Sequence, residues 1–476
     1  MHVLLRKYMY FPLITITVRP EHCDPLYLLR ELGLSRDYCA LLESADRHSK
    51  AQDFSFVALG ARDVLTIRNG EVKGSRFVPD GKVTDALSVL SETVSSGAEG
   101  ERLRMGYIGF LSYEAARDFE DIDLKPDPLL PDSQFVLPEV LLKIDHRQHE
   151  ITIVAHRDTA EDLESIERVI HTSPFREDRR NLALDATKEL FLASQKDIAP
   201  YRKTTREDFC HAITEAQEKI RAGEVFQIVI SQKFVIPDAP PADRVYEQLR
   251  EINPSPYMFF FQTPDHTLVG ASPEMLVRVD GRTISYRPIA GTRRRTGNAE
   301  EDRKMEEELL GDAKERSEHQ MLVDLGRNDV GRVAKIGSVK VKNPFHVETY
   351  AHVFHIVSDI TATMRDDVSA LDVVRSVFPA GTLTGAPKIR AMEIIRELEQ
   401  GTRGIYGGTF GYIDFSGNVD FAITIRTMLF RKGQASLRVG AGIVKDSIPE
   451  HEDDECLHKA RSCLAALHHA RSSAAR

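Results

Sequence analysis

Residues 410–444, FGYIDFSGNVDFAITIRTMLFRKGQASLRVGAGIV, contain apolar runs separated by turn signals. Ser416-Gly417 and Arg431-Lys432-Gly433-Gln434 are typical of tight turns, and residues 435–444 after the second turn predict a strand. Upstream, Asp280-Gly281 lies between two alternating runs and predicts a further hairpin. Because hairpins join antiparallel neighbours, these stretches predict a mainly antiparallel sheet.

Helical segments are expected among these hairpins. Thr204 and Glu207 have the spacing of a capping box, and apolar residues then recur on one helical face until Gly223. A strand is expected at 225–234 and helices at about 299–325, 387–399 and 450–468. Hairpins mixed with long helices predict an α+β fold with large, mainly antiparallel sheets.

Composition excludes several classes of protein. The 476 residues are 42% hydrophobic and 29% charged, which is globular, and the net charge of −10 disfavours nucleic-acid binding. No apolar stretch reaches the ~20 residues of a membrane helix, and residues 14–18 alternate as a strand does and not as a signal peptide. Five cysteines without a CxxC pair favour a reducing compartment. We therefore expect a cytoplasmic protein that binds neither nucleic acid nor membrane.

A shift in composition places a boundary near residue 200. Residues 171–206 include a charged, aperiodic stretch followed by a loop signal at Ala199-Pro200-Tyr201. We expect residues 1–200 to form an N-terminal part and residues 201–476 to form the catalytic region.

Two pairs of glutamates have a spacing that suits a metal site. Glu315 and Glu318 are three residues apart on one predicted helix, and Glu452 and Glu455 repeat the spacing on another. If the two helices face each other, the carboxylates converge and favour a hard cation such as Mg²⁺. The alternative is two solvated helix faces. Lys459, four residues after Glu455, either forms a surface ion pair or faces an anionic ligand.

Other residues could hold an anionic ligand. Gly440-Ala441-Gly442 lets the backbone approach a carboxylate, or it is a simple bulge. Arg426 lies among small residues on a predicted strand and is either a surface charge or a carboxylate fork. His355 lies in an apolar strand, where a core role and a catalytic role are both open. Residues 381–388 lack phosphate-loop spacing but precede a helix N-terminus, which can bind an anion.

Taken together, these segments resemble the chorismate-utilising enzymes, and within them the anthranilate synthase large subunits. The motifs follow the order of the family: PIAGT at 288–292, SEHQMLVDLGRND at 317–329, FPAGTLTGAPK at 378–388 and GAG at 440–442. The resemblance is dense from about residue 204 to 466. It implies an α/β sandwich of two large, mainly antiparallel sheets flanked by helices, with the active site in the cleft between the sheets.

The resemblance also implies a role for each matching residue. Glu318 and Glu455 would bind Mg²⁺, with Glu315 and Glu452 close by. His355 and Thr382 would line the reacting ring, and we hypothesise that His355 assists departure of the allylic hydroxyl. The residues that would hold chorismate are Gly291, Thr292, Tyr406, Arg426, Gly440, Ala441 and Gly442, with Lys459 near the bound carboxylates.

Two positions distinguish between members of the family. Ala290 stands where aminodeoxychorismate synthases carry a nucleophilic lysine, and Gln227 stands where water-using isochorismate and salicylate synthases carry a general-base lysine. A neutral Gln cannot activate water, so ammonia is the expected nucleophile. The expected activity is conversion of chorismate and ammonia into anthranilate and pyruvate. The alternatives are aminodeoxyisochorismate synthase, aminodeoxychorismate synthase, and a non-catalytic chorismate or tryptophan sensor.

The ammonia must have a source. None of the five cysteines lies in a Gly-x-Cys-x-Gly elbow, so the chain carries no convincing glutaminase. We expect a separate glutamine amidotransferase subunit, in a heterodimer or heterotetramer, to supply it.

Two further motifs resemble the halves of a feedback site for tryptophan. They are Leu41-Leu42-Glu43-Ser44 and Asn253-Pro254-Ser255-Pro256-Tyr257-Met258. Glu43 could accept from an α-ammonium group, and Tyr257 with Met258 could form an apolar wall for an indole. The alternative is an ordinary turn with a solvated Glu43. The expected tryptophan-binding residues are Glu43, Ser44, Asn253, Pro256, Tyr257 and Met258.

Overall fold

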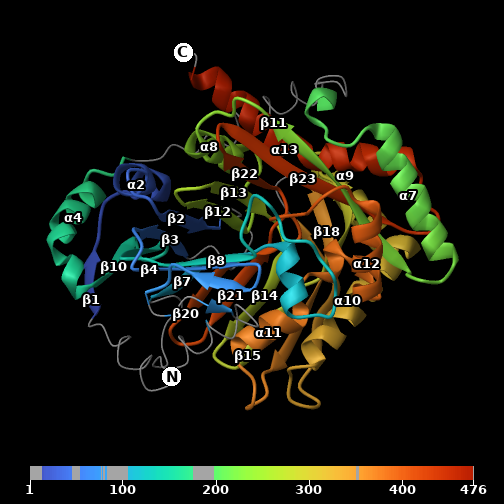
Figure 1. Cartoon of the computed structure of the whole chain (residues 1–476), viewed down its shortest axis with the longest axis horizontal. Coiled ribbons are helices and arrows are strands. Elements are labelled where there is room, and N and C mark those ends of the chain that lie inside the picture. The colour runs from blue at the N-terminus through green and yellow to red at the C-terminus, as the bar shows by residue number, and fades with distance from the viewer. Residues whose placement is uncertain are drawn as a thin grey trace.

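The computed structural model describes residues 13–44, 54–76, 78, 81–82, 90, 105–174, 198–349 and 353–474. In this part of the chain, two antiparallel sheets with flanking helices form the fold (Figure 1). This confirms the expected α+β sandwich.

The first sheet is 11-stranded, in the order β1-β10-β9-β3-β2-β12-β13-β22-β23-β11-β19. Its strands are β1 Leu13–Val18, β10 Glu150–His156, β9 Val140–Asp145, β3 Phe54–Leu59, β2 Cys39–Glu43, β12 Tyr257–Gln262, β13 Thr267–Ser272, β22 Thr427–Arg431, β23 Gln434–Ile443, β11 Gln227–Ile236 and β19 Gly385–Ala386.

The second sheet is 12-stranded, in the order β16-β18-β15-β14-β21-β20-β7-β8-β4-β5-β6, and β17 also pairs with β18. Its strands are β16 Ile289–Arg294, β18 Val353–Thr363, β15 Thr283–Tyr286, β14 Met275–Asp280, β21 Val419–Ile423, β20 Thr409–Asp414, β7 Gly106–Leu111, β8 Ser133–Leu137, β4 Asp63–Arg68, β5 Glu71–Lys73, β6 Gly81–Lys82 and β17 Lys340–Thr349.

Both sheets contain strands from each side of residue 200. In the first sheet Met258 of β12 is paired with Glu43 of β2, and in the second sheet Phe410 of β20 is paired with Phe110 of β7. Residue 200 therefore separates two stretches of sequence that share both sheets.

The two sheets pack face to face around aromatic side chains. Phe259 of the first sheet stacks on Phe410 of the second, with ring centroids 4.3 Å apart. Alternation along β12 sends Phe259 and Phe261 into this inner core, and it sends Met258 and Phe260 into an outer core. The strand is therefore apolar on both faces.

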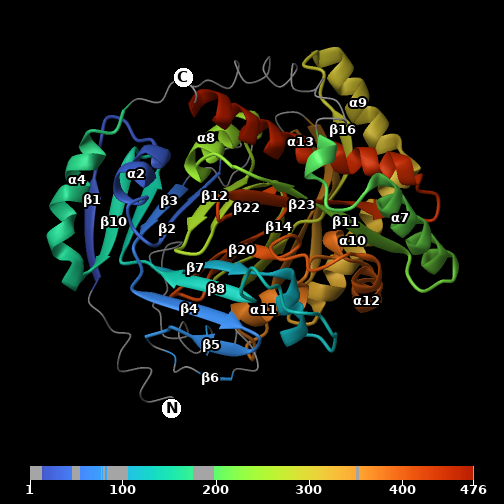
Figure 2. The ribbon, with the colours of Figure 1, turned by 45° about the horizontal axis from the view of Figure 1, so that its top comes forward.

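Helices cover the outer core of the first sheet. Figures 1 and 2 show α2 and α4 beside β1 at one end of this sheet, and α13 running past β22 and β23 towards α7 at the other. The helices in this outer core are α2 Pro25–Leu32, α4 Leu163–His171, α7 Arg206–Arg221, α8 Ala242–Ile252, α12 Lys388–Leu398 and α13 Pro449–Ala474. The helices near the second sheet are α9 Ala299–Gly311, α10 Ala313–Gly331 and α11 Ala370–Val377. The short 3-10 segments are Tyr113–Asp118, Arg157–Asp162, Ala199–Tyr201 and Gly381–Leu383.

The predicted hairpins and the strand at 14–18 are confirmed, whereas two helical predictions need correction. The single helix expected at 299–325 is two helices, because the Asp312 side chain accepts from the backbone N–H groups of Lys314 and Glu315 and starts α10 anew. The cap of α7 is Thr205, which accepts from Asp208 N, so the expected pair of Thr204 and Glu207 is wrong by one residue.

Arg426 differs most from its predicted setting. It lies between β21 and β22 and has a φ of 51°, so it is not part of a strand. Because β21 belongs to the second sheet and β22 to the first, the segment at 424–426 carries the chain from one sheet to the other. The corner brings Arg426 to the junction of the two sheets.

Candidate active site

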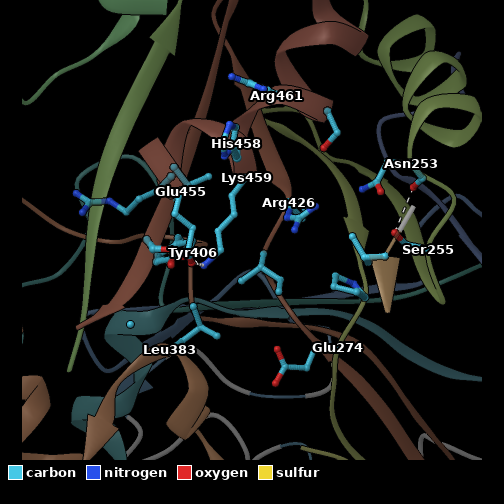
Figure 3. Close-up of a pocket in the computed structure, with 18 of the residues that line it drawn as sticks. Asn253, Ser255, Glu274, Leu383, Tyr406, Arg426, Glu455, His458, Lys459 and Arg461 are labelled. Carbon is cyan, nitrogen blue, oxygen red and sulfur yellow. Dashed lines mark hydrogen bonds and ion pairs between the residues drawn. The ribbon is translucent and has the colours of Figure 1, made fainter. Parts of the chain in front are cut away.

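A cavity of about 840 Å³ gathers most of the predicted site residues (Figure 3). Figure 3 shows Glu274, Tyr406, Arg426 and Lys459 around the same space, the first three on loops and Lys459 on α13. The predicted site residues that line it are Gln227, Gly291, Glu315, Glu318, His355, Thr382, Tyr406, Arg426, Gly440, Gly442, Glu452, Glu455 and Lys459. Thr292 pairs with His355 through the backbone of β16 and β18, while its side chain lies outside the described part of the structure.

The four predicted carboxylates all line this cavity. Glu315 and Glu318 come from α10, and Glu452 and Glu455 come from α13. Burial and the neighbouring Glu315 raise the pKa of Glu318. Burial and the nearby Glu455 likewise raise the pKa of Glu452, while its hydrogen bond to Ser447 opposes this rise. The two helices therefore face each other, as the metal hypothesis requires.

The carboxylates have neighbours that a cation would have to replace. The Gln227 amide donates to Glu318 Oε1 at 3.1 Å, Glu315 forms a 2.9 Å ion pair with Arg293, and Glu455 forms a 2.7 Å ion pair with Lys459. In the described ranges, no three His, Cys, Asp or Glu side chains are already grouped to hold a metal ion. The hard oxygen donors and the like-charge repulsion on Glu318 nevertheless suit a divalent cation such as Mg²⁺.

Arg426 supplies a partly buried positive charge to the cavity. Its guanidinium makes no hydrogen bond or ion pair with any described side chain, and burial lowers its pKa. A partly desolvated guanidinium that faces a cavity without a partner among the described side chains is a suitable place for an anion to bind. The structure thus favours the carboxylate fork over the surface charge.

Backbone glycines form another wall. A Cβ atom on Gly440 would lie 2.6 Å from the Tyr406 hydroxyl, and one on Gly442 would lie 2.7 Å from Gln227 Nε2. At Gly440 the added Cβ would also lie 2.8 Å from the Ile230 carbonyl oxygen, so this position excludes a side chain, whereas the Gln227 amide could move away from a Cβ at position 442. Ala441 points the other way, into the outer core, and its side chain does not line the cavity. Lys459 Nζ donates to the Gly440 carbonyl at 2.9 Å, so this lysine forms the i,i+4 pair with Glu455 and also faces the cavity.

Glu274 is a site residue that the sequence reasoning missed. It follows β13 in a Ser-Pro-Glu loop, where a single carboxylate has no informative spacing. It is buried in the cavity wall, and Thr382 Oγ1 donates to its Oε1 at 2.9 Å. Burial raises its pKa to about 7, so near neutral pH it holds a proton about half of the time.

His355 is held in one orientation by the backbone. Its Nδ1 lies 2.8 Å from the carbonyl oxygen of Gly291, so Nδ1 carries the proton. Burial lowers the pKa of His355 to about 4, which leaves a neutral ring with its lone pair on Nε2. Gly291 has a φ of +63° at a β-bulge, which aims this carbonyl at the imidazole.

A family model described as a chorismate binding enzyme matches residues 38–465. This chain belongs to the chorismate binding enzyme family. Anthranilate synthase component 1 of Thermus thermophilus is 42% identical, over 90% of this chain and 91% of that protein. The corresponding protein of Aquifex aeolicus is 40% identical, over 99% of this chain and 97% of that protein. The crystal structure of anthranilate synthase component I from Streptococcus pneumoniae has a TM-score of 0.72 and 33% identity, over 87% of this chain and 93% of that chain.

In this chorismate binding enzyme, residues of the predicted feedback site are divided between two cavities. Glu43, Ser44, Pro256, Tyr257 and Met258 line a second cavity of about 70 Å³. Asn253 lines the large cavity instead.

Within the second cavity, the predicted polar groups differ in their availability to a ligand. Glu43 is not solvated, because it accepts from the Tyr246 hydroxyl at 2.6 Å and pairs with Arg250 at 2.7 Å. The Tyr257 hydroxyl donates to Asp420 at 3.0 Å. The Ser44 hydroxyl oxygen is buried and has no hydrogen-bond partner among the described residues.

In this family member, the last residue of the segment at 381–388 links two helices. Lys388 Nζ forms a 2.9 Å ion pair with Asp329 and donates to the Val377 carbonyl, with both charged side chains 10% exposed. The lysine therefore joins α12 to α10.

No helix in the described ranges is both long enough and apolar enough to span a membrane.

Proposed function

We propose that this chain is the synthase component of an anthranilate synthase, which converts chorismate and ammonia into anthranilate, pyruvate and water. The observation that carries the proposal is the pair of neutral residues in the cavity. Ala290 offers no nucleophile, and the Gln227 amide is engaged with Glu318. The cavity has no lysine at either of these positions to form an adduct or activate water, which leaves ammonia as the nucleophile.

Recognition of a dianion is supported by the charges of the cavity. Arg426 is placed to receive one carboxylate as a fork, and Gly440 and Gly442 let the backbone approach the ligand. Lys459 adds a second cation in the same space. With its carboxylates held in this way, the ring would lie against Tyr406, His355 and Thr382, for which the family resemblance implies this role.

The protonation states of two residues in the cavity suit them to different proton-transfer steps. Protonated Glu274, with Thr382 donating to its Oε1, carries its proton on Oε2 and can give it to the departing hydroxyl. His355 is neutral in the free protein, so it can accept a proton but has none to donate from Nε2, and its lowered pKa makes it a weak base. Glu274 is therefore the better donor, and His355 can receive the ring proton that is lost as the product becomes aromatic.

Glu318 and Glu455 would hold Mg²⁺, with Glu315 and Glu452 beside them. When bound, the ion would neutralise the ring carboxylate and favour departure of the hydroxyl. The protein's part is to hold these carboxylates on two helices that line one cavity, with Lys459 paired to Glu455.

Ammonia delivery is proposed to require a partner. The relatives are named component 1, which is consistent with a second component, and we propose a glutamine amidotransferase subunit in a heterodimer or heterotetramer. The five cysteines are free, which supports a reducing, cytoplasmic location.

The test is an assay of the purified chain with chorismate, Mg²⁺ and ammonium at mildly alkaline pH. Anthranilate fluorescence should appear with ammonium alone, and glutamine should replace ammonium only when the partner is added. An aminated product that retains the pyruvyl group would identify an aminodeoxyisochorismate synthase. Chorismate binding without turnover would identify a sensor, and glutamine hydrolysis by this chain alone would contradict the partner proposal.

A further inference from the structure

Arg403 lies directly behind the wall of the large cavity. Its side chain is 2% exposed and is anchored by Glu399 at two points. Arg403 Nε donates to Glu399 Oε2 at 3.0 Å, and Nη2 donates to Oε1 at 2.6 Å. This planar contact fixes the orientation of the guanidinium.

The remaining donors of Arg403 hold the cavity wall from behind. Nη1 donates to the Leu383 carbonyl at 2.6 Å, and Nη2 donates to the Val229 carbonyl at 2.8 Å. The guanidinium also lies 5.5 Å from the centre of the Tyr406 ring. Leu383, Val229 and Tyr406 all line the cavity.

Each of these three contacts leads to a residue with a role in the proposed chemistry. Leu383 follows Thr382, which bonds to Glu274. Val229 lies two residues after Gln227 on β11. The Tyr406 hydroxyl is the group that approaches Gly440. One buried side chain thus connects three separate segments of the wall.

We propose that Arg403 is a positioning residue for the chorismate cavity. It does not line the cavity, and it acts by holding the Leu383 and Val229 carbonyls and the Tyr406 ring at fixed positions relative to one another. A lysine keeps the charge but cannot reproduce four directed contacts from one plane. The inference rests on the proposed function, because it concerns the geometry of that active site.

Arg117 provides a matched control for the loss of a buried guanidinium. It forms a 2.6 Å ion pair with Asp132, with side chains 15% and 2% exposed, and neither residue lines the large cavity. Arg117→Lys therefore perturbs a buried ion pair of similar kind without touching the cavity wall.

The experiment compares Arg403→Lys and Arg117→Lys in the ammonium-dependent assay, with folding checked by circular dichroism and thermal unfolding. We expect Arg403→Lys to lower kcat/KM by about 10- to 100-fold, through both a higher KM for chorismate and a lower kcat, because small misplacements in an active site are costly. Arg117→Lys should stay within about twofold of wild type. Methylguanidinium should restore part of the activity of Arg403→Ala and none of that of Arg117→Ala.

Three results would overturn the proposal. The first is that Arg403→Lys folds and its kcat/KM is no lower than that of Arg117→Lys. The second is that Arg403→Lys loses only kcat, by a factor that equals the fraction of this variant that is unfolded. The third is failure of Arg403→Lys to fold while Arg117→Lys folds, since that would make the contacts purely structural. If wild type makes no anthranilate, the proposed function fails, and the heat of chorismate binding by the same variants then decides this inference.

Discussion

At the residue scale, Arg426 shows what residue type can and cannot reveal. Its place between small residues was enough to suggest a carboxylate fork. Its position at a corner between two sheets, with φ of 51°, was not predictable, because the apolar alternation of its neighbours continues through the corner. The positive φ directs a long cation to the sheet junction, where no carboxylate of the described residues pairs with it.

Replacing Arg426 by lysine should therefore be severe. Lysine keeps one charge and loses the two parallel donors that match a carboxylate, so we expect kcat/KM for chorismate to fall by roughly 10- to 100-fold at constant folding. Steady-state kinetics with ammonium measure the effect. Arg431→Lys, at the end of β22 and away from the cavity, is the control. Equal kinetics for both variants would show that Arg426 does not bind the substrate.

The pKa of Glu274, about 7, leads to a second prediction at the residue scale, which concerns the pH dependence of activity. Only the protonated carboxyl can donate, so kcat/KM, corrected for the ammonia concentration, should fall as the pH rises through about 7. The Glu274→Gln variant should lose most of the activity, and its kcat/KM should no longer fall as the pH rises through about 7. A profile of unchanged shape in the variant would exclude Glu274 as the proton donor.

The same raised pKa of Glu274 also predicts how the stability of the protein depends on pH. The folded protein binds a proton on Glu274 more tightly than the unfolded chain, whose carboxyl titrates near 4.5, so stability falls as the pH rises from about 4.5 through about 7. Above that window the ionised carboxylate costs up to about 3 kcal/mol. Glu274→Gln should thus be less active but more stable at pH 8, with a higher Tm than wild type. A lower Tm at pH 8 would contradict the buried charge.

At the element scale, the active site depends on two helices that meet. The glutamate spacing on each helix was visible in the sequence, and the facing of α10 and α13 was not, because helical periodicity contains no information on the distance between elements. The break at Asp312 was also missed. Asn298 caps α9 and Asp312 caps α10, and no proline separates the two helices; the signal for the break was the pair Gly311-Asp312.

Two facing helices imply that each must contribute to the cation site. Glu318→Gln on α10 and Glu455→Gln on α13 should each raise the Mg²⁺ concentration for half-maximal activity by at least about 10- to 100-fold and leave the fold intact. Titration of Mg²⁺ in the chorismate assay measures this shift. Glu308→Gln, an exposed carboxylate on α9, is the control. Near-normal activity of both variants at sub-millimolar Mg²⁺ would exclude these ligands.

At the scale of the whole molecule, the motif resemblance predicted more than the composition shift did. Two antiparallel sheets were expected and are present, yet β2 pairs with β12 and β7 with β20 across residue 200. Charge runs and loop signals report on local solvation, whereas strand order depends on pairings hundreds of residues apart. This interleaving is what places the two halves of the predicted feedback motif side by side.

The interleaved sheets also place the second cavity next to the active site. Residues 253–255 line the large cavity, and residues 256–258 line the small one, so a single loop and strand start separates them. A volume of about 70 Å³ is far below the ~300–1,000 Å³ of ordinary ligand pockets, so an indole requires a more open arrangement. A ligand that selects such an arrangement would move the shared loop and weaken chorismate binding.

We therefore predict inhibition by tryptophan through the small cavity. The unpartnered Ser44 hydroxyl offers it a polar contact, and Ser44→Phe should fill the cavity, abolish inhibition and leave the activity with ammonium unchanged. The coupling between the two ligands should be ~1–3 kcal/mol, and chorismate must weaken tryptophan binding by the same factor by which tryptophan weakens chorismate binding. Calorimetric titrations of each ligand in the presence of the other measure both factors. Unequal factors would place tryptophan in the active site or at several sites, and no binding heat with wild type at millimolar tryptophan would show that this cavity binds no feedback ligand.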